Sequence, residues 1–194
     1  MGRELERKYG ASPELLEQIR KAYGEFTEIQ MKTRYFDTEA RDFGARKWML
    51  RLREENGVTV CTLKTRLPDG SRGEFEARAE TVAEAAPELL GQGAPAEAAA
   101  LLKKGVREQC GAAFTRLAKT VPVPGGAVEL ALDRGAFTAG DRRQPFSEVE
   151  AELKSGDDRV LTAFTENLTA RFPLREEPRS KAQRAFALIS GSPG

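Results

Sequence analysis

The 194-residue chain carries 31 Lys and Arg against 30 Asp and Glu, a formal net charge of +1, so no positive field of the whole protein favours nucleic acid as a partner. It contains no histidine, which excludes Ser-His-Asp and Cys-His catalysis and His-ligated zinc. No apolar run approaches the roughly 20 residues that span a bilayer, and the charged start differs from a signal peptide. We therefore expect a cytoplasmic protein without a membrane partner, whose chemistry rests on carboxylates and cations.

The length fits one domain, and we expect residues 1–189 to form it and residues 190–194 to be a flexible tail. Cys61 and Cys110 lack the paired spacing of a metal or disulfide site, so we expect both to be structural thiols. The chain has neither of the glycine-rich loops that cradle phosphates. A phosphate ligand would therefore have to be held by side chains.

Alternating patterns and turn residues predict eight strands. In chain order they cover about residues 3–9, 27–37, 46–54, 58–66, 72–79, 113–120, 127–137 and 146–154. Helices are expected after Ser12-Pro13-Glu14, twice within 82–109 with a break at Gly91–Pro95, and from Val160 to about Phe172. Closure of an antiparallel sheet removes exposed edges. The expected fold is therefore α+β, an eight-stranded antiparallel β-barrel, or tunnel, with helices packed on the outside.

Charged and apolar residues alternate along several of these strands. Residues 148–153 place Glu148, Glu150 and Glu152 on one face of a strand and three apolar residues on the other. For one strand alone, the ordinary interpretation is a solvated face over an apolar core. Because both signs of charge recur on strand after strand, we favour a tunnel with a polar, charged interior. Its charges must be paired, bound to metal or matched to a polyanion.

The segment Glu4-Leu5-Glu6-Arg7-Lys8 resembles the Glu-x-Glu-x-Lys signature that opens the CYTH, or triphosphate tunnel metalloenzyme, superfamily. Segments similar to later parts of the family follow in order, so that the resemblance spans about residues 3–185. They are Tyr35–Thr38, Leu50–Arg53, Thr62–Lys64, Arg72–Glu76, Thr115-Arg116, Glu129–Asp133, Glu148–Gly156 and Ser180-Lys181.

The resemblance implies a role for each matched residue. The implied metal ligands for one or two Mg²⁺ or Mn²⁺ ions, which prefer oxygen, are Glu4, Glu6, Asp133, Glu148, Glu150 and Glu152. The implied substrate-binding cations are Lys8, Arg51, Arg53, Lys64, Arg72, Arg116 (or Lys119) and Lys181. The implied catalytic residues are Lys8, Tyr35, Lys64, Glu76 and Glu129. Glu148 is expected to contribute less than Glu150 and Glu152, since it can simply orient its neighbours.

Each assignment keeps an ordinary alternative. Any one of the cations can instead form a structural ion pair with a neighbouring glutamate. Tyr35 either forms a Tyr/Lys pair with Lys64, as in hydrolytic members of the family, or lines the wall with a satisfied hydroxyl. Trp48 is expected in the core.

The expected function is metal-dependent hydrolysis of a small anionic triphosphate, foremost inorganic tripolyphosphate to pyrophosphate and phosphate. Few aromatic residues are available as a platform for a ring, with three Tyr and one Trp, so thiamine triphosphatase and class IV adenylate cyclase rank second. A polyphosphate- or nucleotide-binding module without turnover is the remaining alternative. Some members carry a downstream helical domain, and a homodimer is possible.

Overall fold

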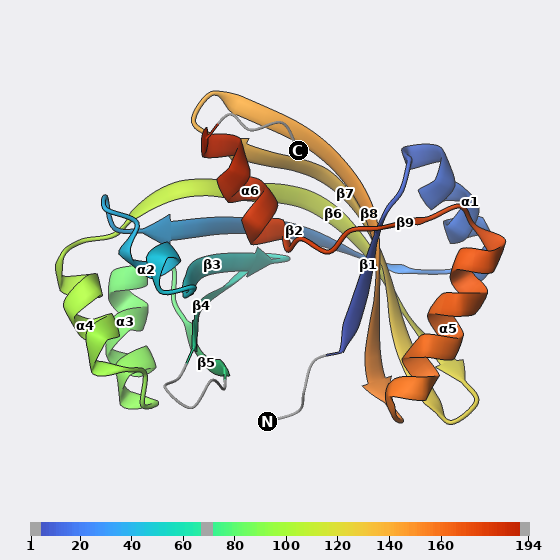
Figure 1. Cartoon of the computed structure of the whole chain (residues 1–194), viewed down its shortest axis with the longest axis horizontal. Coiled ribbons are helices and arrows are strands. Elements are labelled where there is room, and N and C mark those ends of the chain that lie inside the picture. The colour runs from blue at the N-terminus through green and yellow to red at the C-terminus, as the bar shows by residue number, and fades with distance from the viewer. Residues whose placement is uncertain (1–4, 67–71, 191–194) are drawn as a thin grey trace. The chain divides into compact units, whose positions relative to one another are not determined.

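The computed structural model describes residues 5–66 and 72–190, which form two compact units (Figure 1). The first unit contains the described part of Met1–Gln30 together with Phe114–Ala136 and Pro145–Ser180. The second contains the described parts of Met31–Ala113, Phe137–Gln144 and Lys181–Gly194. The chain therefore passes between the two units several times.

Among the described residues, nine strands form one sheet in the order β5-β4-β3-β2-β6-β7-β8-β1-β9, so its hydrogen-bonded ladders end at β5 and β9. The strands are β1 (Glu6–Gly10), β2 (Thr27–Asp37), β3 (Met49–Glu55), β4 (Val58–Arg66), β5 (Arg72–Arg78), β6 (Arg107–Val123), β7 (Gly126–Ala139), β8 (Arg142–Ser155) and β9 (Arg175–Glu176). The helices are α1 (Pro13–Tyr23), α2 (Asp42–Ala45), α3 (Val82–Gly91), α4 (Ala96–Lys103), α5 (Asp158–Arg171) and α6 (Lys181–Ser190). The α+β class and the antiparallel sheet are confirmed.

In the first unit, α1 and α5 cover the apolar face of the strands (Figure 1). Helix α1 begins as its sequence predicts, with the Ser12 hydroxyl accepting from the Leu15 N–H and a proline in the first turn. Ile19 of α1, Leu168 of α5 and Val149 of β8 are all fully buried in the shared core. This core fixes one face of β1, β7 and β8, and the opposite face is left for polar residues.

In the second unit, the apolar faces of β3, β4 and β5 pack against α3 and α4. Helix α3 begins with a capping box in which Thr81 and Glu84 bind each other's backbone N–H groups. Leu63 of β4 and Leu89 of α3 are fully buried in this core, and Trp48 packs against it as expected. Both cysteines are buried free thiols, as expected.

Four elements differ from the expected ones. Helices α3 and α4 confirm the interrupted pair, but strand β6 begins at Arg107, inside the expected helical stretch. Gly111 of this segment lies very close to β2: a Cβ on it would be 2.7 Å from the Thr33 carbonyl oxygen. Strand pairing thus determines this segment, against its weak strand propensity. Helices α2 and α6 and the two-residue β9 were not predicted.

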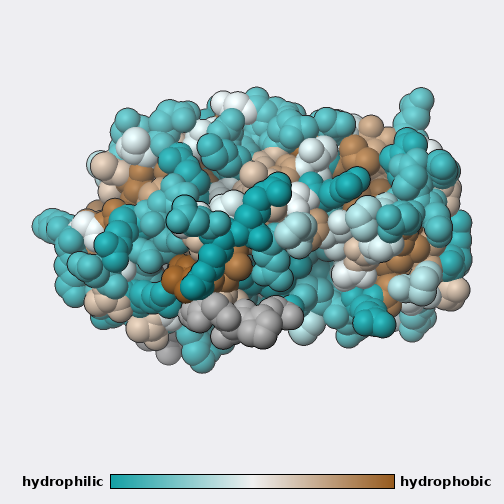
Figure 2. Space-filling view, turned by 90° about the horizontal axis from the view of Figure 1, so that it is seen from above, coloured by the Kyte–Doolittle hydropathy of each residue, from teal (hydrophilic) through white to brown (hydrophobic). Residues whose placement is uncertain are grey.

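The face shown in Figure 2 is mostly hydrophilic, with small and interrupted apolar areas. Among the described residues, Val58 is the large hydrophobic side chain that is strongly exposed, at 48%. None of the described helices combines the length and apolar character that crossing a membrane requires.

Candidate functional site

The first unit has a polar sheet face, here defined by Glu6, Lys8, Arg116, Glu129, Asp133, Glu148, Glu150, Glu152 and Lys154. The register of β1 and β8 places Glu6 opposite Glu152 and Lys8 opposite Glu150. The intervening pair of Tyr9 and Val149 belongs to the buried core. Charged residues therefore lie on one face and apolar residues on the other, as the period of two predicts.

Three carboxylates of this face form a compact cluster. Asp133, Glu148 and Glu150 each offer an oxygen, and these oxygens lie within 4.8 Å of one another. Asp133 and Glu148 are completely buried, and the Glu150 side chain is 13% exposed. Like charges this close repel strongly in a buried setting. The cluster therefore requires cations.

Arg116 of β6 supplies one cation to this cluster. Its Nε donates to Asp133 Oδ1 at 2.8 Å, and its Nη2 donates to Asp133 Oδ2 at 2.7 Å and also to Glu150. Burial alone would lower the pKa of Arg116, but the hydrogen bonds and charges of Asp133 and Glu150 outweigh it and raise that pKa. The guanidinium is thus bound by the carboxylates that would also bind a metal.

The outer part of this polar face holds two further ion pairs. Lys8 Nζ lies 3.2 Å from Glu6. Lys154 Nζ lies 3.1 Å from Glu152 and 3.6 Å from Glu129. The sequence interpretation did not name Lys154, although it continues the alternation of Glu148, Glu150 and Glu152 by two more residues. It also ranked Glu152 above Glu148 as a metal ligand; the compact cluster contains Glu148, and the ranking stays a prediction.

The second unit has its own polar sheet face, defined by Tyr35, Arg51, Arg53, Thr62, Lys64, Glu74 and Glu76. Tyr35 of β2 is paired with Arg51 of β3, and Arg51 is paired in turn with Thr62 of β4. Between them, Leu50 and Leu52 enter the buried core. The same alternation therefore separates charge from core in this unit.

Arg51 and Arg53 lie two residues apart on this face, and Arg53 also forms an ion pair with Glu55 at 3.7 Å. The Nε atoms of both are buried, and neither has a hydrogen-bond acceptor among the described residues. Burial first, and then the charge of Arg53, lower the pKa of Arg51 to about 10, so it stays protonated at neutral pH. Burial also raises the pKa of Tyr35, against the opposing charges of Arg51 and Arg53. An anion would satisfy these donors.

The remaining charged groups of this face are paired. Lys64 Nζ lies 2.8 Å from Glu74, and Glu76 accepts a hydrogen bond of 2.8 Å from the Thr62 hydroxyl. Lys64 lies across from Met49 in the ladder, and Tyr35 across from Arg51. The Tyr35–Lys64 pairing stays a prediction.

Helix α6, which was not predicted, brings two side chains toward Tyr35. The ring of Phe186 lies 6.0 Å from the Tyr35 ring, centroid to centroid. Lys181, named as a candidate from the sequence, begins this helix and is close enough to act electrostatically on Tyr35. The spacing of Ala182, Ala185, Phe186 and Ile189 in the sequence is the signal that could have identified this helix.

One candidate and most of the expected tail lie outside the described residues, and a second candidate is described only in part. Glu4 and residues 191–194 are not among the described residues, and Arg72 is described only as the first residue of β5.

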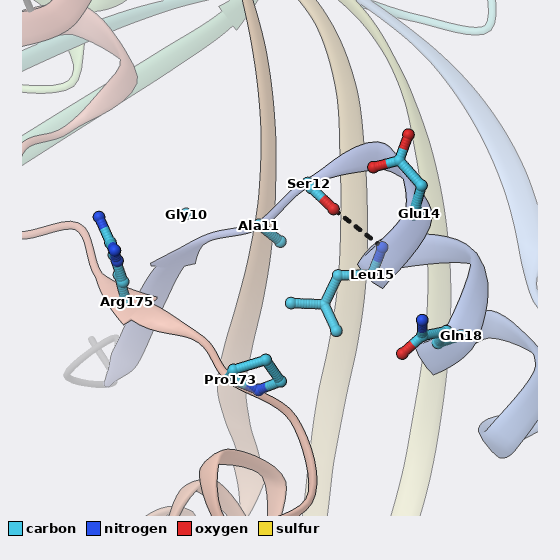
Figure 3. Close-up of a pocket in the computed structure, with 8 residues that line it drawn as sticks. All are labelled: Gly10, Ala11, Ser12, Glu14, Leu15, Gln18, Pro173 and Arg175. Atoms are coloured by element: carbon cyan, nitrogen blue, oxygen red, sulfur yellow. Dashed lines mark hydrogen bonds between the residues drawn. The ribbon is translucent and has the colours of Figure 1, made fainter.

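Two open cavities are found in the first unit. One, of about 460 Å³, is lined by residues at the start of α1 and by the segment Pro173–Arg175 (Figure 3). Leu15 points toward its centre, while Glu14 and Arg175 lie on opposite sides of it. The other, of about 520 Å³, includes Glu129 of the polar face. The first cavity gathers no charged cluster, so the candidate site is the polar face.

The donor set of the acidic cluster fits a hard divalent cation. Mg²⁺ and Mn²⁺ prefer oxygen ligands, and three carboxylates within 4.8 Å supply them. Thiols and imidazoles, which softer metals favour, are not part of this cluster of described residues. The structure therefore offers a suitable site for Mg²⁺ or Mn²⁺ and does not distinguish between them.

Comparison with known proteins agrees with this geometry. The sequence profile described as the CYTH domain matches residues 2–186. An inorganic triphosphatase of Haemophilus influenzae is 28% identical over 200 residues, covering 98% of this chain and 56% of that protein. The chain thus spans about half the length of this curated relative.

Solved structures share the fold at low identity. A candidate adenylate cyclase of Bacillus halodurans matches with a TM-score of 0.61 and 21% identity, covering 94% of this chain and 97% of that one. A candidate adenylyl cyclase of Hippeastrum, with a dominant triphosphatase activity, matches with a TM-score of 0.61 and 20% identity, covering 97% and 96%. At these identities the likeness establishes the fold.

Proposed function

Because the chain belongs to the CYTH domain family, we propose that it is a divalent-metal-dependent hydrolase of a small triphosphate, foremost inorganic tripolyphosphate. The observation that carries the proposal is the carboxylate cluster of Asp133, Glu148 and Glu150 on a charged sheet face, turned away from the core. The Haemophilus influenzae relative, an inorganic triphosphatase, supports the same choice of substrate.

The acidic cluster would hold the metal. Asp133, Glu148 and Glu150 are its inner ligands in this proposal, with Glu6 and Glu152 nearby on the same face and Glu4 a further candidate. When bound, Mg²⁺ or Mn²⁺ supplies positive charge for the phosphate oxygens. Three carboxylates this close repel one another, and a divalent cation would offset that repulsion.

The cations of the polar faces would bind the phosphate chain. A triphosphate carries about four negative charges at neutral pH, and the forked guanidinium suits phosphate oxygens well. Arg51 and Arg53 have buried Nε donors without a hydrogen-bond acceptor among the described residues, and phosphate oxygens would supply one. Lys8, Lys64, Arg72, Arg116 and Lys181 complete the proposed set.

The reaction is an attack of water on the terminal phosphorus. A new P–O bond forms to the water oxygen, the bridging P–O bond breaks in line with it, and pyrophosphate leaves. The water proton passes to a carboxylate, for which Glu76 and Glu129 are the candidates. Each is held by a neighbour, Glu76 by the Thr62 hydroxyl and Glu129 by Lys154. Tyr35, Lys8 and Lys64 would position the phosphate chain.

Phosphate release tests this proposal directly. We expect release from tripolyphosphate with Mg²⁺ or Mn²⁺, and little from ATP or thiamine triphosphate. Glu150→Gln should remove most of the turnover, whereas Glu17→Gln, on the exposed side of α1, should leave it unchanged. Cyclic AMP formed from ATP would instead indicate a cyclase, and preferred cleavage of thiamine triphosphate would indicate that activity.

Binding without turnover would identify the remaining alternative. Tight calorimetric binding of tripolyphosphate, with no phosphate released under any metal condition, would assign the chain to non-catalytic polyphosphate binding. A downstream domain and a homodimer remain part of this proposal. Adding the rest of the Haemophilus influenzae relative to the phosphate-release assay tests whether a downstream domain changes turnover.

A further inference from the structure

We propose that Gln92 is a positioning residue for Glu76: its side-chain amide takes the place of a neighbouring strand at the outer edge of β5 and holds the backbone that carries the Glu76 carboxylate. The inference deepens the proposed function and rests on it, because Glu76 is there a candidate to accept the proton of the attacking water. Gln92 does not touch the phosphate chain in this proposal and acts through Glu76.

The backbone of Glu76 is bound on the side of β5 that faces away from β4. Strand β5 ends the hydrogen-bonded order of the described strands, and successive residues of an antiparallel strand direct their N–H and C=O groups alternately to its two sides. The Glu76 N–H donates to Gln92 Oε1 at 3.2 Å, and Gln92 Nε2 donates to the Glu76 carbonyl at 2.7 Å. One side-chain amide thus binds both groups, as a residue of a further strand would.

Gln92 is itself held in place by α3. It is the C-cap of this helix, and its backbone N–H donates to the Glu88 carbonyl at 3.0 Å. Its Nε2 also donates to the Glu88 carboxylate at 3.4 Å, so a second group orients the amide. Leu89 of the same helix is fully buried in the core of the second unit. The amide therefore reaches β5 from a packed helix, which favours a fixed geometry.

Glu76 is held at two points, its backbone by Gln92 and its carboxylate by Thr62. The Thr62 hydroxyl donates to this carboxylate at 2.8 Å, and Thr62 is buried and lies opposite Glu76 in the register of β4 and β5. A general base must lie within about 3 Å of the proton donor, and a misplacement of about 1 Å can lower the rate about a hundredfold. Loss of the backbone contact should therefore slow the chemical step.

The two hydrogen bonds lie at the surface. Glu76 and Gln92 are both exposed, so water can replace the bonds when the amide is removed. The fold should survive Gln92→Met, because an exposed hydrogen bond contributes little net free energy. A change in turnover would then reflect the position of Glu76 and not unfolding.

Amide hydrogen exchange measures the contact between Gln92 and β5 without turnover. In Gln92→Met, the Glu76 N–H should exchange on the order of tenfold faster, because its acceptor is gone. The N–H groups of Phe75 and Ala77 point to β4 by the same alternation, and they should exchange at their former rates. The matched control is Gln18→Met, which changes an exposed glutamine of α1. Unchanged exchange at Glu76 in Gln92→Met would overturn the inference.

Steady-state hydrolysis of tripolyphosphate provides the second test. Gln92→Met should lower kcat on the order of tenfold and leave KM nearly unchanged, since the cations that bind the phosphate chain are untouched. In the background of Glu76→Gln, the same substitution should cause no further loss, because the carboxylate that Gln92 positions is no longer a base. Gln18→Met should leave both constants unaltered. An unaltered kcat in Gln92→Met, or an equal loss in both backgrounds, contradicts the inference.

The inference and the proposed function can fail separately. If the unaltered chain releases no phosphate from tripolyphosphate, the hydrolase is removed, whereas faster exchange at Glu76 in Gln92→Met still upholds the contact that holds β5. Hydrolysis by the unaltered chain, with unchanged exchange at Glu76 in Gln92→Met, upholds the hydrolase and removes the role of Gln92.

Discussion

The polar faces of the two units handle charge in opposite ways. In the first unit, opposite charges meet: Arg116 is bound by Asp133 and Glu150. In the second, like charges stand next to each other: Arg51 and Arg53 are two residues apart on one strand, and their buried Nε atoms have no acceptor in the described part of the chain. The first face is thus partly neutralised from within, whereas the second keeps two buried Nε donors that a bound anion would satisfy.

This contrast separates charged residues that stabilise the folded state from charged residues that destabilise it. A buried ion pair costs much when one partner is removed, because the other is left uncompensated. A buried charge without a partner already destabilises the folded state, so its removal should not harm the fold. Substitutions in the two faces should therefore move stability in opposite directions.

The largest change in stability is expected for Arg116→Met. It leaves three carboxylates within 4.8 Å of one another without the guanidinium that two of them bind. We expect a loss of about 3 kcal/mol in the free energy of unfolding, as for other broken buried pairs. Urea unfolding in EDTA measures it. The control is Arg171→Met, which removes a guanidinium of α5 that lies against the rings of Tyr23 and Phe172. A loss no larger than that of the control would mean that Arg116 does not compensate the cluster.

Arg51→Met should behave in the opposite way. Burial and the charge of Arg53 disfavour the charged form of Arg51, which lowers its pKa. Its removal should leave the free energy of unfolding unchanged or raise it by about 1 kcal/mol. Pyrophosphate should nevertheless bind roughly tenfold to a hundredfold more weakly, since a charge-assisted hydrogen bond is lost.

Calorimetry and urea unfolding of the same variant test both parts of this prediction. The control is Arg46→Met, in which a half-exposed guanidinium near Asp42 is removed. This control should change neither property by much. A destabilised Arg51→Met with unaltered pyrophosphate binding would show that Arg51 supports the fold and does not serve an anion.

The alternation of charge was readable from the sequence because a strand has a fixed period of two. It identified Glu148, Glu150 and Arg51 as residues of charged faces, and the core positions between them followed automatically. The ion-pair partners of each charged residue could not be predicted from the sequence. Asp133 and Glu150 lie on different strands, and only the register of the sheet decides that Arg116 reaches both. Ranking Glu152 above Glu148 lacked this information.

The elements that escaped prediction are those set by tertiary contacts. Strand β6 continues through Gly111 because its backbone lies against Thr33, a contact between residues far apart in sequence. Helix α6 has a regular apolar spacing, but its position is determined by Phe186 at Tyr35 and by Arg142, which donates to the Leu188 carbonyl at 2.8 Å. Helix α2 depends on Asp37, which accepts from the Phe43 and Gly44 N–H groups. Local propensity does not contain these contacts.

The smallest effect is expected for Lys154→Met, which sharpens the comparison within the first unit. Lys154 contacts Glu152 and Glu129, as Arg116 contacts two carboxylates, but its side chain is 39% exposed against 16% for Arg116. Water screens the pairs of Lys154, so the loss in unfolding free energy should be less than about 1 kcal/mol. Raising the salt concentration should shrink it further, whereas the effect of Arg116→Met should persist. Urea unfolding at low and high salt checks both variants together, and equal losses would mean that burial does not distinguish the two cations.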